Sequence, residues 1–122
     1  MLRKITVAAV FTASVSLAPF AHAADREIAF RPIDKTTMEM TWKAYQGEKF
    51  RVCVKPDGAS GDICGGKNTV YDQWPVASPY HSWDRTTGRM AIQMQLPGCG
   101  KYKVRLKLSA VSFETKEFYL PC

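Results

Sequence analysis

The sequence predicts an all-β fold, an antiparallel β-sandwich of about seven strands closed by two disulfides. Apolar and polar residues alternate with a period of two through most of the chain after residue 24, as in strands that bury one face. Turn-forming residues interrupt the alternation at intervals of about 8 to 12 residues, which is typical of sandwiches. The same region holds four cysteines and shows no amphipathic helix of useful length.

Residues 1–23 have the three parts of a removable export signal. Arg3-Lys4 gives a basic start, an apolar run extends from Ile5 to Phe20, and the small-residue triplet Ala21-His22-Ala23 ends the segment. A bilayer-spanning helix needs about 20 apolar residues, and this run is shorter and interrupted near its end by Pro19. We therefore expect cleavage after Ala23 and export to the periplasm or the cell exterior.

The expected mature chain, residues 24–122, has 99 residues, a size that suits one compact domain. Removing Arg3 and Lys4 from the 17 basic residues leaves 15 against 11 acidic ones, a net charge of +4. This mild excess permits attraction to anionic polymers or acidic proteins without requiring it.

The first half of the mature chain predicts three strands. Two of them, over 27–31 and 38–43, are separated by Pro32 to Lys35. The third, over 50–55, follows the turn at Gln46-Gly47 and ends at Pro56-Asp57-Gly58, which has strong turn chemistry. The inward-facing residues are Ile28 and Phe30, then Met38, Met40 and Trp42, then Phe50, Val52 and Val54.

The second half predicts three more strands, over 89–96, 101–108 and 113–120. The last returns beside its predecessor after a turn near Ser109 to Ser112. Its register stays open, because either parity turns two large apolar residues inward. The inward-facing residues of the other two are Met90, Ile92, Met94 and Leu96, then Tyr102, Val104, Leu106 and Leu108.

The segment from Leu96 to Leu106 resembles the turn into the sixth strand of fibronectin type III domains. There a leucine, Pro-Gly and a corner tyrosine, here Leu96, Pro97-Gly98 and Tyr102, precede alternating apolar residues. Trp42 also lies in the second strand, where those domains carry a core tryptophan. The resemblance implies an immunoglobulin-like sandwich with a role in recognition or scaffolding. The four cysteines and the long stretch before Met90 depart from the family pattern.

Four cysteines permit three pairings. If the last two strands form a hairpin, Cys99 and Cys122 meet at its open end. Cys53 and Cys64 flank a segment whose Pro56-Asp57-Gly58 and Gly61 allow it to fold back. We predict bridges Cys53–Cys64 and Cys99–Cys122, each stabilising the fold by about 3 kcal/mol in the chain-entropy model.

Catalysis finds little support in the mature chain. His81 is its only histidine, and the nearby Asp72 and Asp84 lie in turn-like contexts where aspartate is common. A Cys-x-x-Cys motif is missing, which argues against a redox or zinc role for the cysteines. We expect a non-enzymatic protein with no cofactor, no metal and no nucleic-acid partner.

The segment from Gly65 to Gly88 is long, aromatic and stiffened by Pro75 and Pro79. Our leading hypothesis is that it recognises an exported or envelope protein, as in an inhibitor or immunity-type protein, because Trp and Tyr recur in interface hot spots. The alternative is that Thr69 to Trp74 is another strand and that Trp74 and Trp83 cover the core. The candidate partner-binding residues are Tyr71, Trp74, Tyr80, His81 and Trp83.

A second candidate surface is a row of basic residues on one side of the strand over 101–108, about 20 Å long at two residues per repeat. Its anion-binding candidates are Lys101, Lys103, Arg105 and Lys107. Arg51 and Lys55 are expected alongside. Such a row could bind phosphates or acidic glycans through ionic contacts. The second functional hypothesis is therefore a carbohydrate or anionic cell-envelope polymer binder that uses this row or the rings of Trp74, Tyr80 and Trp83. A solvated charged face is the alternative, because the row lacks interleaved aromatic residues and Glu114 or Glu117 can pair with it.

Overall fold

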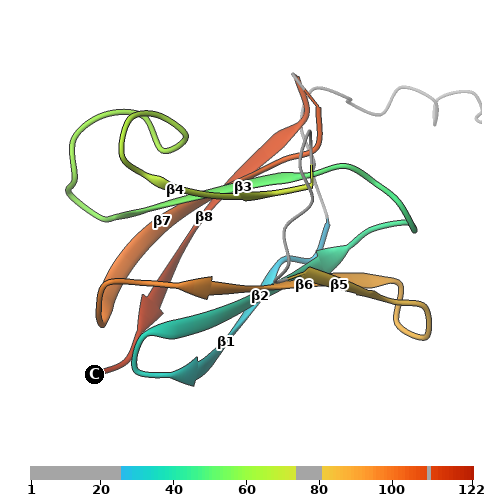
Figure 1. Cartoon of the computed structure of the whole chain (residues 1–122), viewed down its shortest axis with the longest axis horizontal. Coiled ribbons are helices and arrows are strands. Elements are labelled where there is room, and N and C mark those ends of the chain that lie inside the picture. The colour runs from blue at the N-terminus through green and yellow to red at the C-terminus, as the bar shows by residue number, and fades with distance from the viewer. Residues whose placement is uncertain (1–25, 74–80, 110) are drawn as a thin grey trace, which may run out of the picture.

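The computed structural model describes residues 26–73, 81–109 and 111–122, and there the chain forms two four-stranded antiparallel sheets packed face to face (Figure 1). One sheet has the order β1-β2-β6-β5 and the other β4-β3-β7-β8. The strands are β1 (Ala29–Asp34), β2 (Thr37–Lys43), β3 (Arg51–Pro56), β4 (Thr69–Asp72), β5 (His81–Asp84), β6 (Arg89–Gln95), β7 (Gly100–Lys107) and β8 (Phe113–Leu120). The predicted all-β antiparallel fold is confirmed. The expected export signal lies outside the described residues.

Eight strands are described where the sequence predicted about seven. The unexpected one is β5, which pairs with β6 from His81↔Ile92 to Asp84↔Arg89. Its four residues, His-Ser-Trp-Asp, are too few to establish a period-two pattern. β4 agrees with the alternative that the stretch from Thr69 contains a strand.

The core lies between the sheets and is built by the predicted inward-facing residues. Trp42 and Phe50 meet edge to face, with ring centroids 5.1 Å apart. Burying one such large side chain contributes about 1.5–3 kcal/mol relative to leaving it exposed. The core residues with 2% exposure or less are Met38, Met40, Trp42, Phe50, Val52, Val54, Met90, Ile92, Met94, Val104, Leu106 and Leu120.

Tyr102 ties the turn between β6 and β7 to the start of β7. Its hydroxyl donates to the carbonyl of Gly98 at 2.6 Å. Its ring is buried and stacks on Phe118, with centroids 5.4 Å apart. The tyrosine therefore joins the turn to the core.

The pairing of β7 with β8 settles the register that the sequence left open. Tyr102 lies opposite Phe118, so Phe118 shares its inward face, together with Leu120. Phe113 and Tyr119 point outward and are 39% and 60% exposed. This last strand therefore carries aromatic side chains on both faces.

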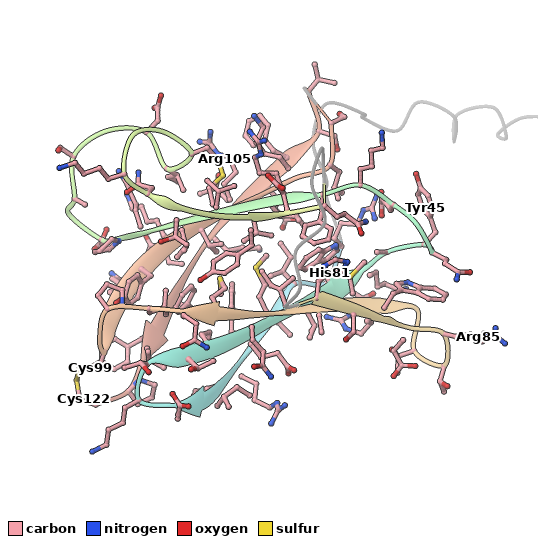
Figure 2. All side chains as sticks on the ribbon, viewed as in Figure 1. Tyr45, His81, Arg85, Cys99, Arg105 and Cys122 are labelled. Carbon is pink, nitrogen blue, oxygen red and sulfur yellow. A yellow bond between two sulfur atoms is a disulfide. The ribbon has the colours of Figure 1, made fainter. Side chains whose placement is uncertain are left out.

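Both predicted disulfides are confirmed. Cys53 and Cys64 are joined with their Cα atoms 5.0 Å apart, and Cys99 and Cys122 with theirs 5.1 Å apart. The second bridge lies at the open end of the β7–β8 hairpin (Figure 2). The first projects from the outer side of β3, where the loop over 57–68 leaves Cys53 no exposed surface.

Candidate functional site

Two aromatic residues of the predicted partner-binding segment are engaged in packing. The hydroxyl of Tyr71, on β4, donates to the backbone oxygen of Gln95 at 3.1 Å and accepts from its N–H at 2.7 Å, so it links the two sheets. Trp83 packs half-buried against the core, and its indole N–H donates to the carbonyl of Ala44 at 2.8 Å. A contribution of these two residues to partner binding stays a prediction.

His81 is half-buried at the start of β5, with its ring 5.4 Å from that of Phe50. Within the described residues its buried Nδ1 has no hydrogen-bond partner. Asp72 instead accepts from Arg51, and Asp84 accepts from the N–H of Thr86. Trp74 and Tyr80 lie outside the described residues.

The basic row is brought together as the sequence predicted. It lies along β7, and the register pairs Arg51 with Lys107 and Lys55 with Lys103 on the neighbouring β3. Arg105 points away from the opposite sheet (Figure 2). We call this surface the basic face; its members are Arg51, Lys55, Lys101, Lys103, Arg105 and Lys107.

At one end of the basic face the ammonium groups have acidic neighbours at long range. Lys101 Nζ lies 4.0 Å from a carboxylate oxygen of Asp57 and 3.6 Å from one of Glu117, and Lys103 Nζ lies 3.8 Å from Asp57. All four side chains are more than a third exposed. Such exposed pairs contribute little to stability and are screened by salt, so an anionic ligand competes for these lysines at small cost.

At the other end the positive charge is less compensated. The guanidinium of Arg105 donates to the hydroxyl of Thr115 at 3.3 Å and lies 4.9 Å from the ring centroid of Phe113, and no carboxylate of the described residues forms an ion pair with it. In the part of the chain that the structure describes, Lys107 makes neither an ion pair nor a side-chain hydrogen bond. Arg51 does pair, with Asp72 at 3.1 Å. Arg105 and Lys107 are therefore the strongest anion-binding candidates.

Aromatic side chains flank the basic face: none is interleaved in the row on β7, but the neighbouring strand supplies two. The register places Phe113 beside Lys107 and Tyr119 beside Lys101. Both rings belong to β8, whose outward face the sequence could not assign. Aromatic rings beside cations provide flat apolar surface next to ionic contacts.

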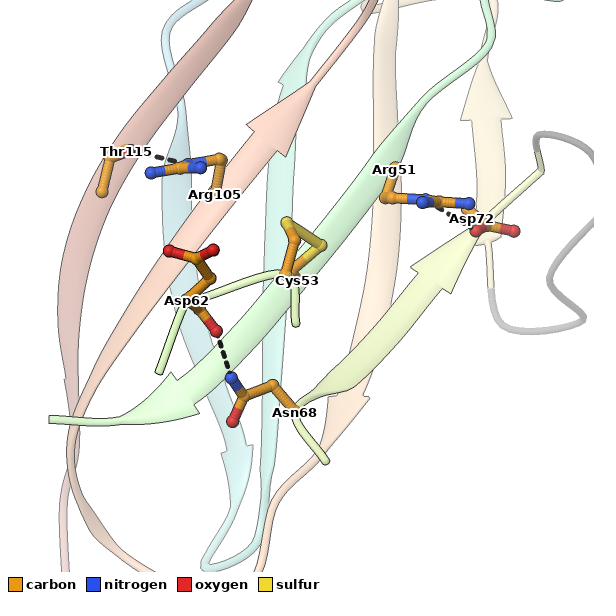
Figure 3. Close-up of a disulfide and its surroundings, with 8 residues drawn as sticks. Arg51, Cys53, Asp62, Asn68, Asp72, Arg105 and Thr115 are labelled. Atoms are coloured by element: carbon orange, nitrogen blue, oxygen red, sulfur yellow. Dashed lines mark hydrogen bonds and ion pairs between the residues drawn. A yellow bond between two sulfur atoms is a disulfide. The ribbon is translucent and has the colours of Figure 1, made fainter. Parts of the chain in front are cut away.

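The loop over 57–68 lies against the basic face. The Cys53–Cys64 bridge holds it to β3, with Arg105 on one side and the Arg51–Asp72 pair on the other (Figure 3). Lys55 Nζ donates to the carbonyl of Ala59 at 3.0 Å. The loop surrounds an open hollow of about 630 Å³ lined by residues 59–62 and 65–68.

The two outer faces of the sandwich differ in charge. On the β1-β2-β6-β5 sheet the basic side chains all have acidic partners, since Arg31 pairs with Glu39 at 3.0 Å while Lys43 and Arg89 share Glu27 at 3.5 and 3.8 Å. With its loop, the opposite face holds seven basic residues (the basic face and Lys67) and four acidic ones (Asp57, Asp62, Asp72 and Glu117). The domain's positive charge is thus concentrated on the basic face.

Neither a protein-family model, nor a curated protein, nor a solved structure matches this chain. Among the residues described, no three His, Cys, Asp or Glu side chains gather in a way that could hold a metal ion. The described ranges also contain no helix long and apolar enough to cross a membrane.

Proposed function

We propose that this chain is an exported, non-enzymatic binding domain with an immunoglobulin-like fold, and that its basic face binds an anionic cell-envelope polymer. Export is supported by the signal-like residues 1–23 together with the pairing of all four cysteines, since disulfides persist in oxidising compartments.

The immunoglobulin-like assignment is supported by strand order and by one hydrogen bond. The order β1-β2-β6-β5 corresponds to A-B-E-D in such sandwiches, and β3-β7-β8 corresponds to C-F-G, with β4 added beside C. The bond from the Tyr102 hydroxyl to Gly98 resembles the tyrosine corner found at the start of strand F.

Polymer binding rests on the charge of the basic face. Arg105 and Lys107 have no carboxylate partner among the described residues. Successive outward side chains on β7 are about 7 Å apart, so a chain with repeated anionic groups can contact several of them. Phe113 beside Lys107 adds an apolar surface for the polymer backbone or sugar rings. A flat face of this kind suits an extended ligand better than a small molecule.

The test compares matched charge removal on the two faces of the disulfide-bonded mature protein. Binding to an immobilised phosphorylated polysaccharide is measured over a salt series for the wild type, for R105Q/K107Q and for R31Q/K43Q, which removes two charges from the opposite face. We expect R105Q/K107Q to weaken binding at low salt by about tenfold or more and to reduce the salt dependence, because fewer counterions are released. R31Q/K43Q should bind nearly as the wild type does. Equal losses in both variants would show that only net charge matters and would refute the site.

Recognition of an exported protein through the segment from Gly65 to Gly88 is the competing proposal. Of its described aromatic candidates, Tyr71 is buried and His81 and Trp83 are half-buried, so each offers a partner only part of its ring or less. A pulldown from periplasmic extract decides between them: a stoichiometric partner lost in W74A but kept in R105Q/K107Q would favour the aromatic segment.

A further inference from the structure

β8 differs from the other edge strands of the sandwich. β4 and β5 have four residues each, and β1 contains Pro32 with a register irregularity beside it. Short length, proline and irregular register are devices that prevent edge strands from pairing with other chains. β8 has eight residues and no proline, and within the described ranges only β7 pairs with it. Charged side chains are another such device, and β8 carries Glu114, Lys116 and Glu117, so its free edge suits a partner strand that neutralises these charges.

The residues of β8 whose backbone groups point to the open edge of the sheet are the same ones whose side chains lie on its outer face. The hydrogen bond from Leu108 N–H to the carbonyl of Ser112, at 2.8 Å, shows which residues of the hairpin exchange backbone hydrogen bonds. By antiparallel alternation, residues 114, 116, 118 and 120 direct their backbone groups to β7, while 113, 115, 117 and 119 direct theirs to the open edge. Val111, Phe113 and Tyr119 are three of the six exposed large apolar side chains among the described residues.

We propose that β8 pairs antiparallel with β8 of a second copy of this chain, about a two-fold axis at Thr115. In this register Glu114 lies opposite Lys116 of the second copy, and Lys116 opposite its Glu114. Val111, just before the strand, falls opposite Tyr119 of the second copy. Glu114 and Lys116 thus meet opposite charges and Val111 meets an aromatic ring, as favourable cross-strand pairs require, whereas Phe113 falls opposite Glu117 of the second copy.

Neighbouring registers lack this complementarity. An axis at Glu114, Lys116 or Glu117 places that charged residue opposite its own copy, which is destabilising. An axis between two residues pairs outward-facing with inward-facing side chains, which the sandwich cannot accommodate. Thr115 is the uncharged residue between Glu114 and Lys116. An axis there puts each of these two charges opposite the other and keeps outward-facing side chains opposite outward-facing ones.

Glu114 supplies a second, independent observation. One of its carboxylate oxygens lies 3.2 Å from Lys116 Nζ of the same chain. The other, Oε1, is buried and has no hydrogen-bond partner within the described residues. An unpaired buried carboxylate oxygen is costly, and the second copy's Lys116 would bring a cation to it.

The pairing would join two sheets into one of eight strands, β4-β3-β7-β8 continued by the same strands of the second copy in reverse. Because the two-fold axis is perpendicular to the sheet, the basic faces of both copies would lie on the same side of the eight-stranded sheet. The dimer does not depend on the proposed polymer binding, but it would let one polymer contact two faces at once and so increase avidity.

The first experiment measures the mass of the disulfide-bonded mature protein by sedimentation equilibrium. The wild type should form a concentration-dependent dimer. E114K and K116E each place like charges across the axis and should dimerise about tenfold more weakly or not at all. An equimolar mixture of E114K and K116E should recover a heterodimer, because opposite charges then face each other again. A wild type that stays monomeric at its highest soluble concentration, or a mixture that does not associate, overturns the proposal.

The second experiment addresses the backbone. T115P removes an N–H that points to the open edge, a position where an edge strand tolerates proline, so the monomer should stay folded. It should fail to dimerise, while T115V, which keeps the N–H, should dimerise. Circular dichroism and thermal melting check that both variants are folded. A T115P variant that dimerises as well as the wild type would place the interface elsewhere and refute the pairing. Because T115P and T115V both lose the hydroxyl to which Arg105 donates, comparing the two variants separates the effect of dimerisation on polymer binding from the effect of that lost contact.

Discussion

At the scale of single residues, Tyr102 joins the turn after β6 to the core through one hydroxyl. Removing that hydroxyl with Tyr102→Phe leaves the Gly98 carbonyl without its donor, and we expect a loss of about 1–2 kcal/mol in the free energy of unfolding. Urea denaturation measures the loss. Tyr119→Phe is the matched control, because Tyr119 is 60% exposed and its hydroxyl can bond to water; it should change stability little. Equal effects in the two variants would contradict the role given to Tyr102.

Glu48 is the one carboxylate among the buried side chains described. Its two oxygens accept from both terminal nitrogens of Arg26 at 2.7 and 2.8 Å, a bidentate geometry that is among the stronger charge-assisted pairs. Gln73 also donates to its backbone carbonyl. The pair therefore fastens the segment before β1 to the turn before β3.

We expect Glu48→Ala to cost about 2 kcal/mol, below the full cost of breaking a buried pair, because Arg26 is 27% exposed and water can reach it. Glu39→Ala breaks the pair with Arg31, whose side chain is 68% exposed, and should cost less than about 1 kcal/mol. Chemical denaturation of both variants compares the two losses. A larger loss for Glu39→Ala would contradict this ranking.

At the scale of elements, the two disulfides differ in their access to solvent. Cys53 is fully buried between β3 and the loop over 57–68 and its partner Cys64 is half-buried, whereas Cys99 and Cys122 are both exposed at the end of the last hairpin. Thiol–disulfide exchange requires the attacking thiolate to reach a sulfur atom, so access limits its rate. The two bridges should therefore respond differently to a mild reductant.

We expect Cys99–Cys122 to be reduced first under native conditions, while Cys53–Cys64 persists until the loop or the domain opens. Timed alkylation followed by peptide mapping gives the order. Adding urea below the unfolding midpoint should narrow the difference, because opening of the loop exposes the protected bridge. Simultaneous reduction of both bridges without denaturant would contradict the protection of Cys53.

At the scale of the whole molecule, the export proposal predicts the N-terminus of the mature protein. Expressed with residues 1–23 in a Gram-negative host, the protein should be recovered from the periplasm or the medium beginning at Ala24, with two disulfides. Intact-mass measurement with and without reduction gives both results. Recovery of the uncleaved chain in the membrane fraction would show that the segment is a retained anchor.

Much of the fold follows from residues whose pattern is local. Met38, Met40 and Trp42 alternate with polar neighbours, and the extended backbone alone then turns them to one side. β5 escaped prediction because four residues are too few to show that alternation. The inward face of β8 could not be predicted for a different reason. Large apolar residues occur at odd positions (Phe113 and Tyr119) and at even positions (Phe118 and Leu120), so the alternation does not favour either face.

In the candidate site, too, features set by a single strand could be predicted from the sequence, and features set by the alignment of two strands could not. The shared direction of Lys101, Lys103, Arg105 and Lys107 could be predicted because it is a property of one strand. The nearness of Phe113 to Lys107 could not, because it depends on how two strands align. Tyr71 likewise looks like a surface aromatic until the end of β6, 24 residues away, provides its hydrogen-bond partner.

By itself, then, the sequence determined the all-β class, the inward residues of the central strands and both disulfides, because alternation and loop closure act over short stretches of chain. Only the tertiary structure decided which face of β8 is exposed, which aromatic residues serve the core, and that positive charge and aromatic rings share one surface. Those outcomes depend on contacts between strands distant in sequence, whose alignment is set by the packing of the two sheets as a whole.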